Sequence, residues 1–428
     1  MLTMNMTFRI YPSADQEAMM LDWLETCRRL YNRCLRDLKT WLNGKKCPID
    51  RCSLKQEYIV PADLPFPSYL EQKRQLTQWK KENPWFKAVH SQVTQDVVKR
   101  MHNTWEAFKK RGFGFPRFKK YGQFRSFLFP QFKNPPLQLP SWEGSWRGGY
   151  QIKLPKIGSV LIELHRPIPE GFVIKQVRVL SRARGTKWYV VITVQSNVEV
   201  PNPLPKGRGL AIDIGLENFL TTSDNFTIKP ARFFRELQSR LKELQRKASR
   251  KKKGSKNWEK EQIGVAKLHH KIANYRKNFH FQVAHQLCDQ GDMIFVEDID
   301  FGVSAKGFLG KSMLDGGFGQ FRTILKWVCW KRDKFFAQVD HKYSSQICPN
   351  CGTHTGKKPL SQHQYICPEC NYQTTRDHAA AEVLLQRGLG SVQFVRMDDA
   401  ERKLPSNGDL SGSVWDWLDK CRSRNTQE

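Results

Sequence analysis

The sequence lacks the features that place a chain in or across a membrane. None of its 428 residues belongs to an apolar run of 18, so no transmembrane helix is expected. The opening segment, MLTMNMTFRIYPS, has no basic stretch followed by an apolar one, so no secretory signal is expected either. These two absences predict a cytosolic protein.

Acidic residues are scarce. The chain has 41 Asp and Glu against 71 Lys and Arg, which gives a formal net charge of +30. A surplus of this size predicts a polyanionic partner, either nucleic acid or an acidic membrane. Hydrophobic residues make up 39% of the chain, so it can form real cores, and wholesale disorder is not expected. Its length favours two to four domains.

The eleven cysteines do not suggest a disulfide framework, because a cytosolic compartment keeps thiols reduced. Cys27 and Cys34 lie on the apolar stripe of an expected helix and are predicted to be core residues. Four others follow the spacing C-x2-C-x15-C-x2-C, which is typical of a structural zinc ribbon: Cys348, Cys351, Cys367 and Cys370. Four thiolates complete a tetrahedral Zn²⁺ shell and leave no open position for catalysis. The alternatives are four unrelated cysteines or two redox pairs.

Hydrophobic periodicity divides the chain near residue 205. The first part is expected to contain a strand over 3–10, a capping box of Ser13 and Gln16, an amphipathic helix from Met20 to Trp41, and helices over 68–82 and 91–111. From 124 to 200, short alternating runs separated by Gly and Pro predict a small antiparallel barrel or sandwich. The segment PNPLPKGRG is the clearest linker.

The second part alternates buried strands with basic helices. The expected elements are a strand in GLAIDIG, a hairpin from FLTTSDN and FTIKP, a helical hairpin over 231–287 broken near 249–256, a strand in DMIFVED, a helix near 320–337, a strand in FAQVDHK and a helix over 375–387. A Gly-rich segment, 302–319, is either a lid or an ordinary connector. No motif is evident after residue 390.

Three acids stand out against this pattern. Asp213 lies in a strand among Ile and Leu, Glu297 ends the second buried strand, and Asp377 lies in the first turn of the last helix. A buried unpaired carboxylate costs several kcal/mol unless it is paired or binds a metal. Each acid alone also has an ordinary explanation, as a turn, strand-end or helix-dipole residue. Together they are what a two-Mg²⁺ phosphoryl-transfer site requires.

Several longer motifs make the sequence familiar over roughly residues 3–390. They are FRIYPSADQEAMM, GFPRFKK, LPKIGSVLIELHRPIP, AIDIGLENFLTTSD, ASRKKKGSKNWEK, HHKIANYRKNFHFQVAHQL, FVEDID, SSQICPNCG and CNYQTTRDHAAAEVLL. In these the chain resembles the TnpB family, transposon-encoded RNA-guided DNA endonucleases related to compact type V CRISPR effectors. The segment 43–88 looks longer than in common family members, and RDHAAAE stands where many relatives have RDxNAA.

The resemblance implies a multidomain α+β fold: a small wedge β-barrel with a helical recognition insertion, followed by an RNase H-like (RuvC) α/β nuclease with an inserted zinc ribbon. The implied boundaries are 1–10 and 121–205 for the wedge, 11–120 for the recognition domain, 206–344 and 372–390 for the nuclease, 345–371 for the ribbon, and 391–428 for a flexible tail. The family's catalytic triad corresponds here to Asp213, Glu297 and Asp377.

The resemblance also implies the partners and the reaction. The expected function is Mg²⁺-dependent hydrolysis of double-stranded target DNA beside a short motif, guided by an RNA from the transposon end, in the prokaryotic cytosol or nucleoid. The expected state is a monomer, with a dimer as the alternative. The alternative functions are a nuclease-inactive RNA-guided repressor, a compact type V CRISPR effector, or a transposase.

Two clusters of basic residues are the candidate nucleic-acid contacts, although basic clusters are often only solvated surface. One flanks the end of the 91–111 helix and the other the break in the helical hairpin: Lys109, Lys110, Arg111, Arg117, Lys119, Lys120, Lys251, Lys252, Lys253 and Lys256. Trp105, Phe113, Phe115 and Phe118 either stack on bases or, as is commoner, pack in the core.

Overall fold

The computed structural model describes residues 1–46, 65–132, 137–138, 150–301, 310–359 and 362–399. The chain forms two compact units, Met1–Glu199 and Val200–Glu428, which are described separately. Much of the segment 43–88 that looked longer than usual, the first part of the Gly-rich segment, and the tail from residue 400 onward lie outside the described residues. No described helix is long and apolar enough to span a membrane.

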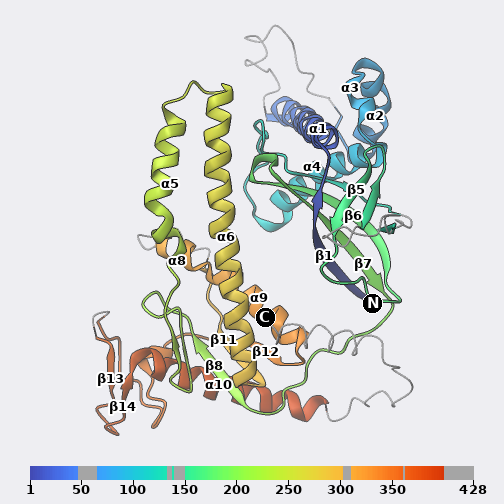
Figure 1. Cartoon of the computed structure of the whole chain (residues 1–428). Helices are drawn as coiled ribbons and strands as arrows, with labels where there is room; N and C mark the ends of the chain where they lie inside the picture. The colour runs from blue at the N-terminus through green and yellow to red at the C-terminus, as the bar shows by residue number, and fades with distance from the viewer. Residues whose placement is uncertain (47–64, 133–136, 139–149, 302–309, 360–361, 400–428) are drawn as a thin grey trace. The chain divides into compact units, whose positions relative to one another are not determined.

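The first unit is a seven-stranded antiparallel sheet with helices inserted after its first strand. The strand order is β2-β6-β7-β1-β5-β4-β3, so β1 is central and pairs with β7 and β5 (Figure 1). The strands are β1 (Leu2–Tyr11), β2 (Ser126–Phe129), β3 (Leu137–Gln138), β4 (Gln151–Leu154), β5 (Gly158–Glu163), β6 (Val173–Arg182) and β7 (Lys187–Ser196), with the 3-10 turn η2 (Ala183–Gly185) between the last two.

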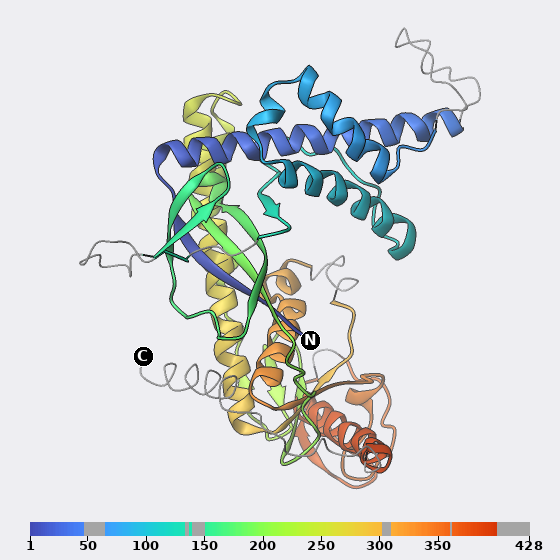
Figure 2. The ribbon, with the colours of Figure 1, turned by 90° about the vertical axis from the view of Figure 1, so that its right-hand side faces the viewer.

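Four helices follow β1 before the chain returns to the sheet. They are α1 (Ala14–Lys46), α2 (Tyr69–Glu82), α3 (Trp85–Ala88) and α4 (Ser91–Arg111). Figure 2 shows α1 running alongside α2 and α4. The predicted capping box is present: the backbone N–H of Ser13 donates to Gln16 Oε1 at 3.0 Å, and the N–H of Gln16 donates to Ser13 Oγ at 3.3 Å. The helix over 91–111 is confirmed at both ends.

The predicted barrel is not closed. Among the described strands, the edge strands β2 and β3 do not pair with each other, so the sheet is an open half-barrel. The reason lies in the core, where α1 and α4 pack against β2. The buried Trp23 ring of α1 lies 5.4 Å from the Phe127 ring and 6.3 Å from the Phe129 ring, centroid to centroid. Helices therefore fill the space that strand closure would occupy.

The second unit has a five-stranded sheet of order β10-β9-β8-β11-β12, in which β8, β11 and β12 are parallel and β9 is antiparallel to β8 and β10. Its strands are β8 (Gly209–Asp213), β9 (Leu220–Thr222), β10 (Thr227–Ile228), β11 (Met293–Glu297) and β12 (Phe335–Val339). Its helices are α5 (Phe233–Ser249), α6 (Lys256–Gln290), α8 (Gly310–Gly316), α9 (Phe318–Lys331) and α10 (Arg376–Asp399). A short segment with η3 (Ser344–Gln346), β13 (Gln364–Ile366) and β14 (Gln373–Thr375) precedes α10.

Helices cover both faces of this sheet. Leu210 and Ile212 of β8 pack in one apolar cluster with residues of α6 and α9, whereas Ala211 packs in another with Leu384 of α10. The alternation along β8 therefore assigns even positions to α6 and α9 and odd positions to α10. At Gly388 an added Cβ would lie 2.5 Å from the Phe295 ring, so α10 lies on the sheet as closely as it does because this residue is glycine.

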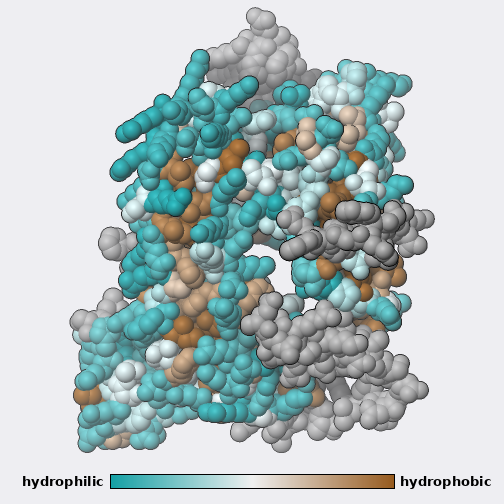
Figure 3. Space-filling view, in the orientation of Figure 1, coloured by the Kyte–Doolittle hydropathy of each residue, from teal (hydrophilic) through white to brown (hydrophobic). Residues whose placement is uncertain are grey.

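The helical hairpin of α5 and α6 is stabilised by its own apolar strip. Leu241 of α5 faces Val265, Leu268 and Ile272 of α6. The space-filling view shows apolar side chains gathered along this hairpin, with hydrophilic side chains around them (Figure 3). The predicted break falls where expected, between Ser249 and Lys256.

Two predicted boundaries are wrong. The helix expected near 320–337 ends at Lys331, because Asp333 takes a left-handed conformation (φ +53°) and the following apolar residues form β12. The last helix, expected to end near 387, continues to Asp399, so the first nine residues of the predicted tail are helical. The described part of the Gly-rich segment forms α8 and the start of α9.

A buried polar network joins three helices of the first unit and gives a stability prediction. The Gln72 amide donates to Cys34 O at 3.2 Å and to Asp37 Oδ2 at 3.0 Å, and its oxygen accepts from His102 Nε2 at 2.9 Å. Gln72→Leu should leave Cys34 O, Asp37 Oδ2 and His102 Nε2 without these hydrogen bonds. We expect it to lower the free energy of unfolding, measured by chemical denaturation, by about 1 to 3 kcal/mol. Gln78→Leu makes the same change at an exposed position of α2 and should be close to neutral; equal effects would contradict the network's role.

Candidate active site and metal centre

The two strand acids lie side by side at one edge of the second sheet. The register pairs Val296 with Ile212, so Glu297, the last residue of β11, lies level with Asp213, the last residue of β8. Both occupy odd positions of their strands, on the α10 face with Ala211 and Phe295. Asp213 is half-buried and Glu297 is only 4% exposed. The suggestion that Glu297 is a solvent-exposed strand end is therefore wrong.

The third acid reaches the same place from α10. Asp377 lies in the first turn of that helix, and its charge acts directly on Asp213. In the described part of the chain only the four cysteines bring three or more ligand atoms within 4.8 Å of one another, so the carboxylates converge more loosely. Oxygen donors alone make up this set, which suits a hard cation such as Mg²⁺ and its ordered waters.

The pKa values of Asp213 and Glu297 are both strongly raised. Burial, and then the charge of Asp377, raises the pKa of Asp213 to about 7. Burial, and then the charge of Asp213, raises the pKa of Glu297 to about 9, although the backbone N–H of Ile214 donates to Glu297 Oε1 at 3.2 Å. Burial and the mutual repulsion of these acids thus outweigh the charges of Arg376 and Arg322, which act to lower the two pKa values, and a bound cation would relieve the repulsion.

Sequence reasoning missed the groups that orient Asp377. The Asn218 amide donates to Asp377 Oδ2 at 3.3 Å, and Lys229 Nζ donates to Asn218 Oδ1 at 2.8 Å. His378 Nε2 donates to Ser223 O at 3.1 Å, which ties the first turn of α10 to the end of β9. His378 thus holds the helix against the sheet, a role that needs tertiary contacts to detect.

The four predicted cysteines are brought together. Their Sγ atoms all lie within 4.8 Å of one another, and the pairs Cys348–Cys370 and Cys351–Cys367 are 3.6 Å apart. A tetrahedral Zn²⁺ with bonds of about 2.3 Å places its sulfurs about 3.8 Å apart, so the cluster fits a zinc ribbon. The thiols are free rather than disulfide-bonded, and Cys27 and Cys34 are fully buried in the other unit, as predicted.

The ribbon packs directly on the first turns of α10. Ala379, two residues after Asp377, lies in one buried cluster with Cys348, Tyr365 and Cys367. The Tyr372 hydroxyl donates to Glu382 Oε2 at 2.6 Å, a second tie between the ribbon and the helix. The position of Asp377 therefore depends on a ribbon whose own core is the thiol cluster.

The ten predicted basic contacts remain a prediction. Six lie in the first unit, at the end of α4 and in the loop after it, and four lie in the second unit, at the turn between α5 and α6. Lys109 and Lys110 both pair with Glu106, at 2.8 and 3.5 Å. Of the aromatic candidates, Trp105 is buried and Phe115 packs against it, whereas Phe113 and Phe118 are exposed.

Comparison with known proteins gives three family-model matches. The OrfB model of the IS605 group, described as "Probable transposase", matches residues 190–306. The model "Cas12f1-like, TNB domain" matches residues 318–384, and a "Helix-turn-helix domain" model of the OrfB group matches residues 1–47. In that last segment the structure has β1 followed by one continuous helix.

Individual relatives match almost the whole chain. "Putative RNA-guided DNA endonuclease InsQ" of Escherichia coli (strain K12) is 30% identical over 418 residues, which is 93% of this chain and 95% of the relative. "Putative RNA-guided DNA endonuclease" of Streptomyces pristinaespiralis is 26% identical, over 90% and 89% of the two chains. A solved structure of the mini RNA-guided endonuclease CRISPR-Cas phi3 covers 90% of this chain and 92% of its own, with 9% identity and a TM-score of 0.45.

A TnpB-like protein of Acanthamoeba polyphaga mimivirus matches a shorter part, with 26% identity over 32% of this chain and 27% of the relative. Full-length similarity at 30% identity is the finding that decides the family. The chain belongs to the TnpB family.

Removal of one thiol should disturb both the metal and the helix. We expect Cys370→Ser to lose the one zinc per chain that elemental analysis should find in the unmodified protein. Because the ribbon packs on Ala379, amide hydrogens in the first turns of α10 should also exchange faster. Cys288→Ala alters a buried cysteine outside the cluster and should keep both zinc and protection. Full zinc content and unchanged exchange in Cys370→Ser would refute this coupling.

The raised pKa values predict how stability depends on pH. Between about pH 4 and pH 7 the folded protein holds a proton on Asp213 that the unfolded chain has released, so stability falls as pH rises. In magnesium-free buffer we expect Asp213→Asn to be more stable than the unmodified protein at pH 8, by about 2 to 4 kcal/mol, and to show little difference at pH 4. Glu369→Gln, at an exposed carboxylate, is the control. Parallel stability curves for Asp213→Asn and the unmodified protein would contradict the prediction.

Proposed function

We propose that this chain is an RNA-guided DNA endonuclease of the TnpB type. The observation that carries the proposal is the convergence of Asp213, Glu297 and Asp377, from three distant segments, on one side of the second sheet. The printed names of the full-length relatives support the same activity. Asp213, Glu297 and Asp377 are the proposed catalytic residues.

The second unit is the proposed RuvC nuclease. Numbered along the chain, its strands lie in the order 3-2-1-4-5 with the second strand antiparallel, the order expected of an RNase H-like sheet. The proposed boundaries stay those implied by the sequence: 206–344 and 372–390 for the nuclease, 345–371 for the ribbon, and a wedge with its recognition insertion before residue 205. The half-barrel and the helices between β1 and β2 support the wedge assignment.

The three carboxylates would hold two Mg²⁺ ions, with Asp213 between the other two acids. When bound, the ions supply an activated water for in-line attack and stabilise the leaving oxygen of a DNA phosphodiester. The chain's own groups fix the ligands: the Ile214 N–H orients Glu297, and Asn218, backed by Lys229, orients Asp377. Burial of Glu297 excludes water from the back of the site.

The proposed partners are a guide RNA from the transposon end and double-stranded target DNA beside a short motif. The net charge of +30 supports a large phosphate-binding surface, to which the ten basic residues would contribute. The proposed state is a monomer in the prokaryotic cytosol or nucleoid, with a dimer as the alternative.

A transposase is the second candidate, favoured by the description of the family model over residues 190–306. RNase H-like acids also support strand transfer, so the triad alone does not separate the two reactions. The products do: an endonuclease leaves hydrolysed ends, whereas strand transfer joins donor DNA to target DNA.

Replacing the central acid should separate cutting from binding. With the copurified RNA and a matched target, we expect Asp213→Ala to lower the rate of Mg²⁺-dependent cutting by at least about 10³-fold, because it removes one of the three carboxylates that would hold the ions. RNA binding by filter retention should not change. Asp224→Ala, at an acid that pairs with Arg208 on the surface, should cut normally. Normal cutting by Asp213→Ala would overturn the assignment, and joined products would favour the transposase.

A further inference from the structure

The first unit contains a surface pocket whose lining includes Lys119, one of the ten proposed nucleic-acid contacts, together with residues that have no role in the proposal so far. Residues of helices α1 and α4 and of the segment 119–126 line this pocket, which is open to solvent and has a volume of about 410 Å³. This volume falls within the range of ordinary small-ligand sites. Its lining includes Tyr31, Arg100, Asn103, Lys119, Gln123 and Arg125.

The pocket carries an excess of positive charge. No lining residue is acidic, whereas Arg100, Lys119 and Arg125 are cationic. Behind the lining, Asp96 pairs with Arg100 Nε at 2.6 Å. The same carboxylate also faces Arg178, whose pKa is lowered by burial and by the charge of Arg100. One carboxylate therefore lies close to two half-buried guanidinium groups, and an anion in the pocket would be stabilised.

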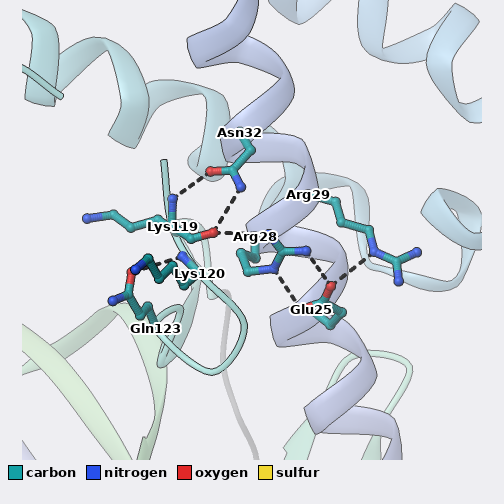
Figure 4. Close-up of polar contacts among 7 residues, drawn as sticks. All are labelled: Glu25, Arg28, Arg29, Asn32, Lys119, Lys120 and Gln123. Carbon is teal, nitrogen blue, oxygen red and sulfur yellow. Dashed lines mark hydrogen bonds and ion pairs between the residues drawn. The ribbon is translucent and has the colours of Figure 1, made fainter. Parts of the chain in front are cut away.

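A set of hydrogen bonds fixes the lysine at the pocket's edge (Figure 4). The Asn32 amide donates to Lys119 O at 2.9 Å, and the Lys119 N–H donates to Asn32 Oδ1 at 2.8 Å. Arg28 Nη1 donates to the same carbonyl at 3.0 Å and is itself held by two bonds to Glu25. Because the Lys119 backbone is hydrogen-bonded to α1, binding requires no further ordering of the backbone at this residue.

After Lys119, the segment 120–123 forms a turn held by two hydrogen bonds between its first and last residues. The Lys120 N–H donates to Gln123 Oε1 at 2.9 Å, and the Gln123 N–H donates to Lys120 O at 3.0 Å. Lys119 Nζ lies 5.6 Å from the centroid of the Tyr31 ring of α1, while the Lys119 backbone faces Asn32, as Figure 4 shows. These hydrogen bonds therefore give the segment 119–123 a defined backbone conformation, which positions the basic residues Lys119 and Lys120.

Aromatic rings form another wall of the pocket. The rings of Tyr31 and Phe124 lie 6.3 Å apart, and the Arg100 guanidinium lies 5.6 Å from the Phe124 ring. In the same loop, Phe113 and Tyr121 are 61% and 69% exposed. Cations that bind phosphate next to rings that accept a base are the combination that proteins use for single-stranded nucleic acid.

We propose that this pocket binds one nucleotide of single-stranded nucleic acid, with its phosphate at Lys119 and Arg125 and its base against the Phe124 wall. The inference rests on the proposed function, which supplies the nucleic acid, and adds a binding site to it. The nucleotide comes from the guide RNA or from an unpaired strand of the DNA. Both present the same phosphodiester chemistry, and the experiment distinguishes them.

The test measures binding by the full-length, zinc-loaded protein. The probes are labelled oligouridylate and oligodeoxythymidylate of about 12 nucleotides, a length within the usual site size for such proteins. We expect Lys119→Gln/Arg125→Gln to weaken binding of one or both by about tenfold. The slope of log affinity against log salt should also fall by about 0.7, the value for one single-strand phosphate that is no longer neutralised. The control variant Lys153→Gln/Lys175→Gln removes the same charge from exposed lysines of β4 and β6.

The outcomes separate the two hypotheses. Loss confined to the RNA probe assigns the pocket to the guide, loss confined to the DNA probe assigns it to an unpaired DNA strand, and loss with both supports a site for either. If the unmodified protein binds and the pocket variant matches the control variant, the pocket proposal is wrong and the proposed function stands. If the unmodified protein binds neither probe, both are wrong. Circular dichroism and thermal melting confirm that each variant is folded.

Discussion

The repulsion among three carboxylates is the constraint on which the second unit depends. Asp213 and Glu297 meet Asp377 where burial raises the free energy of the two strand carboxylates in their charged form. Among the described residues, no cationic side chain pairs with Glu297 or Asp213 at contact distance. Packing elsewhere must offset this cost. The offset comes from the apolar clusters on both faces of the sheet, and from α10, whose glycine at 388 lets it approach the Phe295 ring closely.

This constraint explains why a metal-binding ribbon lies next to the acids. Asp377 belongs to the first turn of a helix, where a chain frays unless it is held. The ribbon packs on Ala379, Tyr372 bonds to Glu382, and His378 bonds to the end of β9, so three contacts fix that turn. A zinc ion bound by four thiolates has no open position for chemistry, yet it would determine where the third carboxylate points.

The first unit also holds like charges close together, but here they are positive. Its sheet remains open because α1 and α4 fill the space beside β2, and the segment after α4 is attached to α1 by Asn32 and Arg28. Arg100 and Arg178 share a single carboxylate, which leaves the wall of a pocket cationic. In both units a well-packed core supports uncompensated charges, negative in one and positive in the other.

The sequence by itself determined the local features. The four cysteines were identified by the three-residue step within each pair and the standard gap between the pairs, and the capping box by Ser13 and Gln16, because both patterns are short and fixed in sequence. The alternation in β8 indicated which face Asp213 occupies. The end of α9 was misplaced because Phe335 and Phe336 continue an apolar pattern that helix and strand share, and only the left-handed Asp333 separates them.

Only the tertiary structure decided how distant segments meet. The pairing of β8 with β11 placed Glu297 beside Asp213, and the packing of α10 brought Asp377 to them. Neither the orienting pair Asn218 and Lys229 nor the attachment of Lys119 to Asn32 has a sequence pattern, because each joins residues whose separation in the chain carries no periodicity. Electrostatic and hydrogen-bonding partners are selected by distance in space, which a linear pattern does not contain.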